Sequence, residues 1–155
     1  MPKEIERKFL LDLARWQAVE KPAGEHFRQG YLVTDPQKTI RVRLTDTCGY
    51  LTIKGISTGA TRLEYEYEIP TAEAKELLDN FAIAELSKIR YKITYQHKIW
   101  EVDEFLGANK GLFVAEIELQ SEDEQFDLPT WVTKEVTGEE KYYNSNLTTH
   151  PYQNW

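Results

Sequence analysis

The sequence predicts a mainly β (α+β) domain in which eight antiparallel strands close into a barrel, with a charged interior and helices packed outside. Two observations support this prediction. Polar and apolar residues alternate with a period of two, which is typical of strands, in eight segments of the 155-residue chain. In most of these segments the polar positions carry charges of one sign, whereas an ordinary solvent-facing strand mixes neutral and charged residues. The segments are residues 3–10, 26–33, 39–45, 50–54, 62–69, 88–95, 99–106 and 113–119.

The charged rows are basic on some strands and acidic on others. Residues i and i+2 of one strand share a face and lie ~7 Å apart. At that spacing two guanidinium groups can bind adjacent phosphates, and two carboxylates can reach one hard cation. Like charges this close repel each other, so they need counter-charges or ligands. The basic rows are Arg41 with Arg43 and Lys88 with Arg90 and Lys92; the acidic rows are Glu64 with Glu66 and Glu68, and Glu116 with Glu118.

Two arrangements are compatible with these rows. In the first, the charged faces form the solvated side of an open sheet, which is the ordinary interpretation for any single pair of charges. In the second, the strands close into a barrel with the charges inside, and the repetition of the pattern on seven strands favours it. Such a lumen would need water, metal and a polyanion to be stable. An outer-membrane barrel shows the same alternation, but the expected helices have no place in it.

Helices are expected between the strands. Asp12 is a suitable N-cap for the first helix, and Thr71, directly after Pro70, for the second. Pro129 occupies a position that the first turn of a short helix tolerates. The predicted helical segments are residues 11–20, 71–81, 129–134 and 142–149. Their apolar faces are expected to cover the outside of the barrel.

The composition limits the possible partners. The chain has 19 basic and 26 acidic side chains and a net charge of −7, which excludes a protein that coats nucleic acid by charge alone. An anionic ligand is still possible, because a local basic cluster can outweigh the average. The one cysteine, Cys48, cannot form an intrachain disulfide, and the chain contains no signal-peptide or membrane-spanning run. We expect a single cytoplasmic domain over residues 1–155, with neither a nucleic acid duplex nor a membrane as partner.

The N-terminal charged row resembles a family motif. Glu4, Glu6 and Lys8 read E-x-E-x-K, which is the hallmark of the CYTH domains, also called triphosphate tunnel metalloenzymes. The rest of the chain resembles the family in the same order, over essentially its full length. The matching segments are RQGYL (28–32), IRVRL (40–44), LTIKG (51–55), RLEYEYEI (62–69), KIRY (88–91), WEVDEF (100–105), VAEIEL (114–119) and EVTGEEKYYNSNL (135–147).

The resemblance implies a barrel whose tunnel binds a small-molecule triphosphate together with a divalent cation, Mg²⁺ or Mn²⁺. It also assigns roles by position. The substrate-binding residues would be Lys8, Arg41, Arg43, Lys54, Lys88 and Arg90. The metal ligands would be Glu4, Glu6, Asp103, Glu116 and Glu118. The catalytic residues would be Lys8, Glu64 and Glu66, the last two holding a second metal or orienting the attacking water. Rim, counter-charge, structural or surface roles are expected for Glu68, Glu101, Arg28, Arg62, His26, His97 and His150.

The resemblance also implies an activity. The family includes inorganic triphosphatases, thiamine triphosphatases and class IV adenylyl cyclases, and the compact chain favours hydrolysis of inorganic tripolyphosphate by in-line attack of water. Thiamine triphosphatase and adenylyl cyclase are the alternatives within the family. A non-catalytic module that binds polyphosphate or nucleotides is the alternative of another class, although it has little use for acidic pairs. Lys8 is hypothesised to have a lowered pKa and to help activate the water. Monomer and homodimer are both compatible with the sequence.

Overall fold

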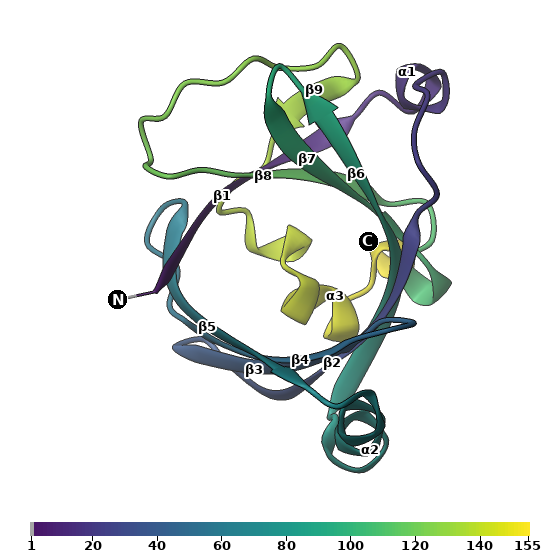
Figure 1. Ribbon diagram of the computed structural model, residues 1–155, viewed down its shortest axis with the longest axis vertical. Coiled ribbons are helices and arrows are strands. Elements are labelled where there is room, and N and C mark those ends of the chain that lie inside the picture. Colours follow the sequence, from purple (N-terminus) through teal and green to yellow (C-terminus); the bar gives the residue numbers. More distant parts are fainter. Residues whose placement is uncertain (1) are drawn as a thin grey trace.

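Eight antiparallel strands form a closed ring in the computed structural model, which describes residues 2–155 (Figure 1). Their order is β5-β4-β3-β2-β6-β7-β8-β1, and β1 also pairs with β5 to close the ring. The predicted barrel is therefore confirmed. The strands of the ring are β1 (Lys3–Leu11), β2 (Glu25–Asp35), β3 (Lys38–Leu44), β4 (Gly49–Gly55), β5 (Thr61–Ile69), β6 (Ala84–Tyr95), β7 (Lys98–Phe105) and β8 (Phe113–Glu118).

Strand β1 closes the barrel by changing partners along its length. Residues 3–5 pair with β5, and residues 6–9 pair with β8. Lys8 consequently lies opposite Glu116 in the register of β1 and β8. The E-x-E-x-K motif thus lies where the ring closes, next to the acidic row of β8.

A ninth strand, β9 (Val132–Glu135), lies outside the ring against the end of β1. The predicted helix over residues 129–134 is therefore wrong. The Trp131 carbonyl accepts a hydrogen bond from the Asp12 backbone N–H at 2.9 Å. Arg7 of β1 donates to both carboxylate oxygens of Glu135, at 2.6 and 2.7 Å. These contacts with β1 outweigh the local helical signal, as tertiary pairing often does.

The other helices form where they are expected; the second has the predicted bounds, 71–81, and the first and last have different ends. The first helix is shorter than predicted because β1 continues through Leu11; Asp12 is its N-cap and accepts the Arg15 N–H at 3.2 Å. In the second, Pro70 and not Thr71 occupies the N-cap position, without a side-chain cap. The helices are α1 (Leu13–Gln17), α2 (Thr71–Phe81) and α3 (Asn144–Thr149), with 3₁₀ turns η1 (Gly107–Asn109), η2 (Glu140–Tyr142) and η3 (Tyr152–Asn154). Within residues 2–155, none of the helices has the length and hydropathy needed to cross a membrane.

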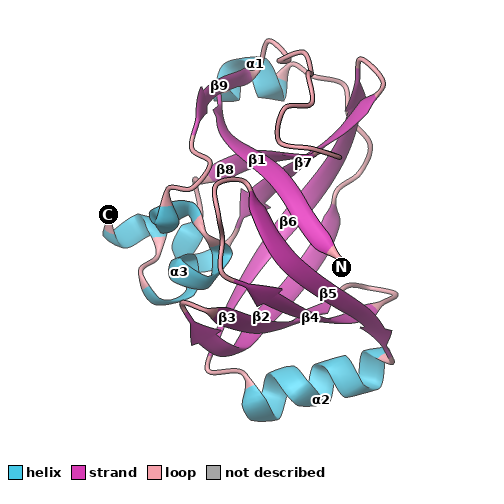
Figure 2. Ribbon diagram, turned by 90° about the vertical axis from the view of Figure 1, so that its left-hand side faces the viewer, coloured by secondary structure: helices cyan, strands magenta, loops and turns pink. Residues whose placement is uncertain are grey.

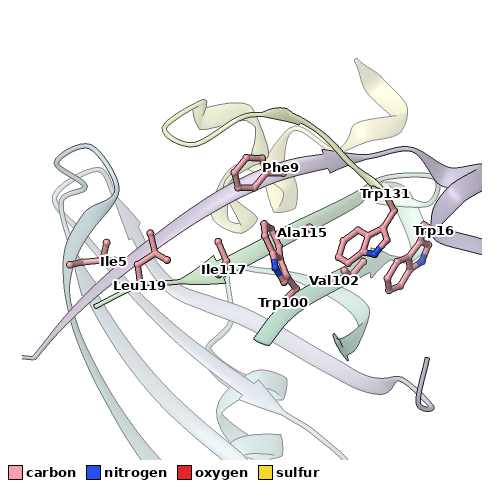
Figure 3. Close-up of a cluster of buried hydrophobic side chains, with 9 residues drawn as sticks. All are labelled: Ile5, Phe9, Trp16, Trp100, Val102, Ala115, Ile117, Leu119 and Trp131. Atoms are coloured by element: carbon pink, nitrogen blue, oxygen red, sulfur yellow. The ribbon is translucent and has the colours of Figure 1, made fainter. Parts of the chain in front are cut away.

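The largest hydrophobic cluster lies on the outer side of the barrel wall, under α1 and the segment after β8 (Figure 3). Trp131 packs edge-to-face on Trp16 and Trp100, with ring centroids 5.0 and 5.9 Å apart, and Phe9 packs on Trp100 at 5.5 Å. Because side chains alternate along a strand, outward apolar residues such as Phe9 direct the charged residues between them into the barrel.

Helix α2 covers the outside of the barrel, and α3 lies at one of its ends (Figures 1 and 2). Leu78 and Ala74 of α2 are buried against Val42 of β3. The helix also approaches β2 so closely that a Cβ atom at Gly30 would lie 2.8 Å from Leu78 Cδ2 and 2.9 Å from Ala82 Cβ. The sheet therefore has no room for a side chain at Gly30.

We predict that Gly30→Ala lowers the free energy of unfolding by about 1–3 kcal/mol, because the added methyl group overpacks the contact between α2 and the sheet. Gly55→Ala is the matched control, since its new Cβ would meet Leu63 Cβ at an ordinary 3.6 Å. Urea denaturation of both variants measures the difference. Equal stability of the two variants would contradict the close approach of α2.

Candidate functional site

The inside of the barrel is a cavity of about 340 Å³ lined by charged side chains from β1 to β8. All the predicted site residues except Asp103 line it. One end of the cavity is bounded by residues at and before the start of α3, including Tyr143, Asn144 and Ser145. The charged strand faces therefore converge on one internal space and do not form the outer side of an open sheet.

The basic row of β6 is held by one buried carboxylate. Asp103 of β7 is fully buried, and its Oδ2 accepts from Lys88 Nζ at 2.7 Å. The Arg90 guanidinium binds the same carboxylate through two hydrogen bonds, of 2.7 and 2.9 Å, and also contacts Glu101 at 3.2 Å. Burial lowers the pKa of Lys88 to about 7 in spite of Asp103, and Arg90 adds to the decrease. An anion beside Lys88 would favour its charged form.

The basic row of β3 lies on the same side of the barrel as the row of β6, with only β2 between them, and it has fewer acidic contacts. Arg41 Nη2 donates to Thr52 Oγ1 at 3.2 Å and lies 3.6 Å from a Glu66 oxygen, while Arg41 Nε is buried with no hydrogen-bond partner. Arg43 Nε donates to the side-chain oxygen of Gln29 at 3.1 Å. Burial lowers the pKa of Arg43 to about 9, and the nearby Arg41 contributes. A buried donor without a partner is rare. Arg41 as a whole lines the cavity, where its charge can interact with an anionic ligand.

Two carboxylates meet between β1 and β8. Glu6 and Glu116 both line the cavity and influence each other's pKa. Burial raises the pKa of Glu6 well above its usual value, and the charge of Glu116 raises it further. Burial also acts to raise the pKa of Glu116, but Lys8 and Arg90 lower it overall. A cation between the two carboxylates would relieve their repulsion.

A second acidic pair lies near the closure of the ring. Lys54 Nζ is 3.0 Å from a Glu4 oxygen and 3.2 Å from a Glu64 oxygen. Burial raises the pKa of Glu4, although Lys54 opposes this. The cation of β4 is thus held between carboxylates of β1 and β5.

Lys8 lies among carboxylates. Its Nζ is 3.9 Å from a Glu6 oxygen and 5.4 Å from the centre of the Tyr143 ring. Burial alone would lower the pKa of Lys8, but Glu116 and Glu6 raise it overall. The hypothesis of a lowered pKa is therefore wrong, because the neighbours of Lys8 are acidic and not basic. Lys8 is a cation in this site.

Most of the residues with expected rim, structural or surface roles lie outside the cavity lining, and Arg62 is an exception. Arg28 lies outside the cavity lining and pairs with Glu85 at 2.6 Å and Asp79 at 2.9 Å. Arg62 lines the cavity, but its guanidinium donates to the Gly55 carbonyl. The residues His26, His97, His150 and Glu68 are not in the lining.

The site also contains neutral side chains that the charge pattern of the sequence does not indicate. Gln29, which is fully buried, and Asn144 bridge the two basic rows through hydrogen bonds. Phe27 lines the cavity with its ring centre 4.5 Å from the Arg43 guanidinium, and Cys48 also lines it. An uncharged side chain adds nothing to a pattern of charge sign, so only a match to RQGYL and EVTGEEKYYNSNL could have indicated Gln29 and Asn144.

The donor set suits a hard divalent cation. Within residues 2–155, no three Asp, Glu, His or Cys side chains are already grouped closely enough to hold a metal ion. The carboxylates of Glu4, Glu6, Glu116 and Glu118 nevertheless face one cavity. Burial raises the pKa values of Glu4, Glu6 and Glu118, and neighbouring carboxylates add to the increase. Carboxylate oxygens are the ligands that Mg²⁺ and Mn²⁺ prefer, and a divalent cation would offset the repulsion between these carboxylates.

Comparisons with known proteins agree with this geometry. An inorganic triphosphatase of Acetivibrio thermocellus is 49% identical over 156 aligned residues, covering 100% of this chain and 99% of the relative. An inorganic triphosphatase of Nitrosomonas europaea is 34% identical, covering 93% of this chain and 95% of the relative. The crystal structure of an inorganic triphosphatase superposes with a TM-score of 0.62 at 31% identity, covering 96% of this chain and 95% of the other. The family model of the CYTH domain matches residues 2–152, and the chain therefore belongs to the CYTH family.

Proposed function

We propose that this protein is an inorganic triphosphatase that hydrolyses the terminal phosphoanhydride of tripolyphosphate inside the barrel. One observation carries the proposal: basic rows and acidic pairs face the same cavity of about 340 Å³. The relatives named inorganic triphosphatase support it. A module that only binds phosphate would have no use for the acidic pairs.

The basic residues would bind and align the substrate. Arg41 and Arg43 of β3, together with Lys88 and Arg90 of β6, can neutralise a phosphate chain laid along this part of the barrel wall. Lys8 and Lys54 would add cationic contacts from β1 and β4, which makes six basic residues in all. Holding the chain extended presents its terminal phosphorus for in-line attack by water, so positioning and charge neutralisation supply most of the catalysis.

The acidic residues would hold the cation and the water. Glu4, Glu6, Glu116 and Glu118 are the proposed metal ligands, and Mg²⁺ or Mn²⁺ bound there would offset the charge that develops on the phosphate. Glu66 accepts a hydrogen bond from Thr52 at 3.0 Å and lies beside Arg41. We propose that Glu64 and Glu66 orient the attacking water or hold a second cation.

Asp103 fits a different role from the metal ligand that the sequence suggested. It is fully buried, does not line the cavity, and binds Lys88 and Arg90 through both carboxylate oxygens. We propose that it positions these two cations. We also propose that residues 1–155 act as one domain in the cytoplasm, as a monomer or homodimer, with neither nucleic acid nor membrane as partner.

A phosphate-release assay tests the activity. With Mg²⁺ or Mn²⁺, we expect the protein to hydrolyse tripolyphosphate faster than thiamine triphosphate or ATP, and to lose activity when EDTA removes the metal, since the acidic pairs then lack their cation. Cyclic AMP is assayed in parallel. A preference for ATP with a cyclic product would identify a cyclase, and tight binding without phosphate release would identify a binding module.

Substitutions in the cavity test whether its charges act in the reaction. Glu6→Gln and Arg41→Ala should each reduce kcat/KM at least about tenfold, because each removes a charge aimed at the metal or phosphate, and both should stay folded by circular dichroism. Glu68→Gln and Arg28→Ala are matched controls outside the cavity lining and should retain their rates. Normal rates in both cavity variants would argue against the site.

The role of Asp103 can be separated from metal binding. Asp103→Asn should raise the KM for tripolyphosphate and lower the free energy of unfolding by about 3–5 kcal/mol, because it leaves Lys88 and Arg90 buried without their anion. The Mg²⁺ concentration for half-maximal rate should stay unchanged. A large increase in that concentration, with normal stability, would identify Asp103 as a metal ligand instead.

A further inference from the structure

A chain of hydrogen bonds links the two basic rows at the end of the cavity where α3 lies. Arg43 Nε donates to Gln29 Oε1 at 3.1 Å, and Gln29 Nε2 donates to Asn144 Oδ1 at 3.0 Å. Lys88 Nζ donates to the same Asn144 oxygen at 2.8 Å. Gln29 is fully buried, so water cannot replace these partners.

The cations at the two ends, Arg43 and Lys88, determine which atom donates in each of these hydrogen bonds. Arginine and lysine side chains can only donate hydrogen bonds, so both cations must meet carbonyl oxygens. Arg43 thereby turns the oxygen of Gln29 toward itself and the amide nitrogen toward Asn144. Lys88 independently requires the oxygen of Asn144. Both ends thus give Asn144 the same orientation, with its oxygen toward the wall and its Nδ2 directed elsewhere.

The Nδ2 group of Asn144 is left as a donor at the cavity. Within residues 2–155, Asn144 Nδ2 has no hydrogen-bond partner. The atom is also not fully buried, so a ligand can reach it. Asn144 itself is half-buried and lines the cavity together with Lys88 and Arg43. A neutral donor therefore stands beside two proposed phosphate-binding cations.

We propose that Asn144 is a further substrate-binding residue, whose Nδ2 donates a hydrogen bond to a phosphate oxygen, and that Gln29 is the positioning residue that fixes its orientation. The proposal rests on the proposed function, because it takes a triphosphate as the occupant of the cavity. The contact gives the phosphate chain a directional anchor at the α3 end, where the other proposed contacts are cationic.

An isosteric substitution separates this contact from a purely structural role. Asn144→Asp keeps an acceptor for Lys88 and Gln29 but replaces the donor with a carboxylate oxygen. We expect the KM for tripolyphosphate, measured by phosphate release with Mg²⁺, to rise about tenfold to a hundredfold, the size of a lost hydrogen bond to a charged group. Thermal unfolding without substrate should be unchanged or shifted upward, because the new carboxylate pairs with Lys88.

Ser145→Asp is the matched control for charge. Ser145 also lines the cavity, so its variant adds the same negative charge while leaving the Asn144 amide in place. Asn144→Ala is a second variant that adds no charge and removes the donor. We expect the KM to rise more in Asn144→Asp than in Ser145→Asp, and to rise in Asn144→Ala.

Two results would overturn the contact while leaving the proposed function intact. The first is that Asn144→Asp and Ser145→Asp have equal KM values while the unsubstituted protein is active. The second is that Asn144→Ala has an unchanged KM. If the unsubstituted protein neither hydrolyses tripolyphosphate nor is stabilised by it against thermal unfolding, the proposed function fails, and the contact with it.

Discussion

The rest of the tunnel depends on the buried carboxylate of Asp103. Removing a charged side chain from water costs several kcal/mol unless a partner and hydrogen bonds compensate. Asp103 supplies both for Lys88 and Arg90, with oxygen-to-nitrogen distances of 2.7–2.9 Å. It therefore allows two cations to lie side by side in the barrel wall, where both line the cavity. Without this anion, the row of β6 would repel the row of β3.

Other charges in the cavity are less completely compensated, and this difference separates binding groups from supporting groups. The Arg41 guanidinium lies 3.6 Å from the carboxylate of Glu66, and the pKa of Glu6 is raised by burial and by Glu116. Charged groups that are incompletely compensated are stabilised most by a ligand of opposite charge. An anionic chain and a cation entering together would satisfy both sets, whereas either alone would leave one set uncompensated.

The sequence was sufficient for the features that repeat. Alternation and charge sign predicted all eight strands of the ring, because side-chain direction in a strand has a fixed period. Features decided by single tertiary contacts were not predictable in this way. Strand β9 forms because its edge meets β1, the acidic surroundings of Lys8 depend on the register of β1 with β8, and Gln29 and Asn144 carry no charge. The role of Asp103 follows from its contacts with Lys88 and Arg90 on the neighbouring strand β6, which alternation alone does not show.

The net charge of −7 is consistent with a polyanion site once the charges are located. Arg28 lies outside the cavity and is paired with Glu85 and Asp79, so it contributes little field inside. The cations that line the cavity act at short range and in a medium of lower dielectric constant, where each interaction is stronger. The acidic excess includes carboxylates in the same cavity, which would attract the divalent cation proposed to accompany a triphosphate there. Placement in the barrel therefore decides which anion binds, and the overall charge mainly disfavours a nucleic acid surface.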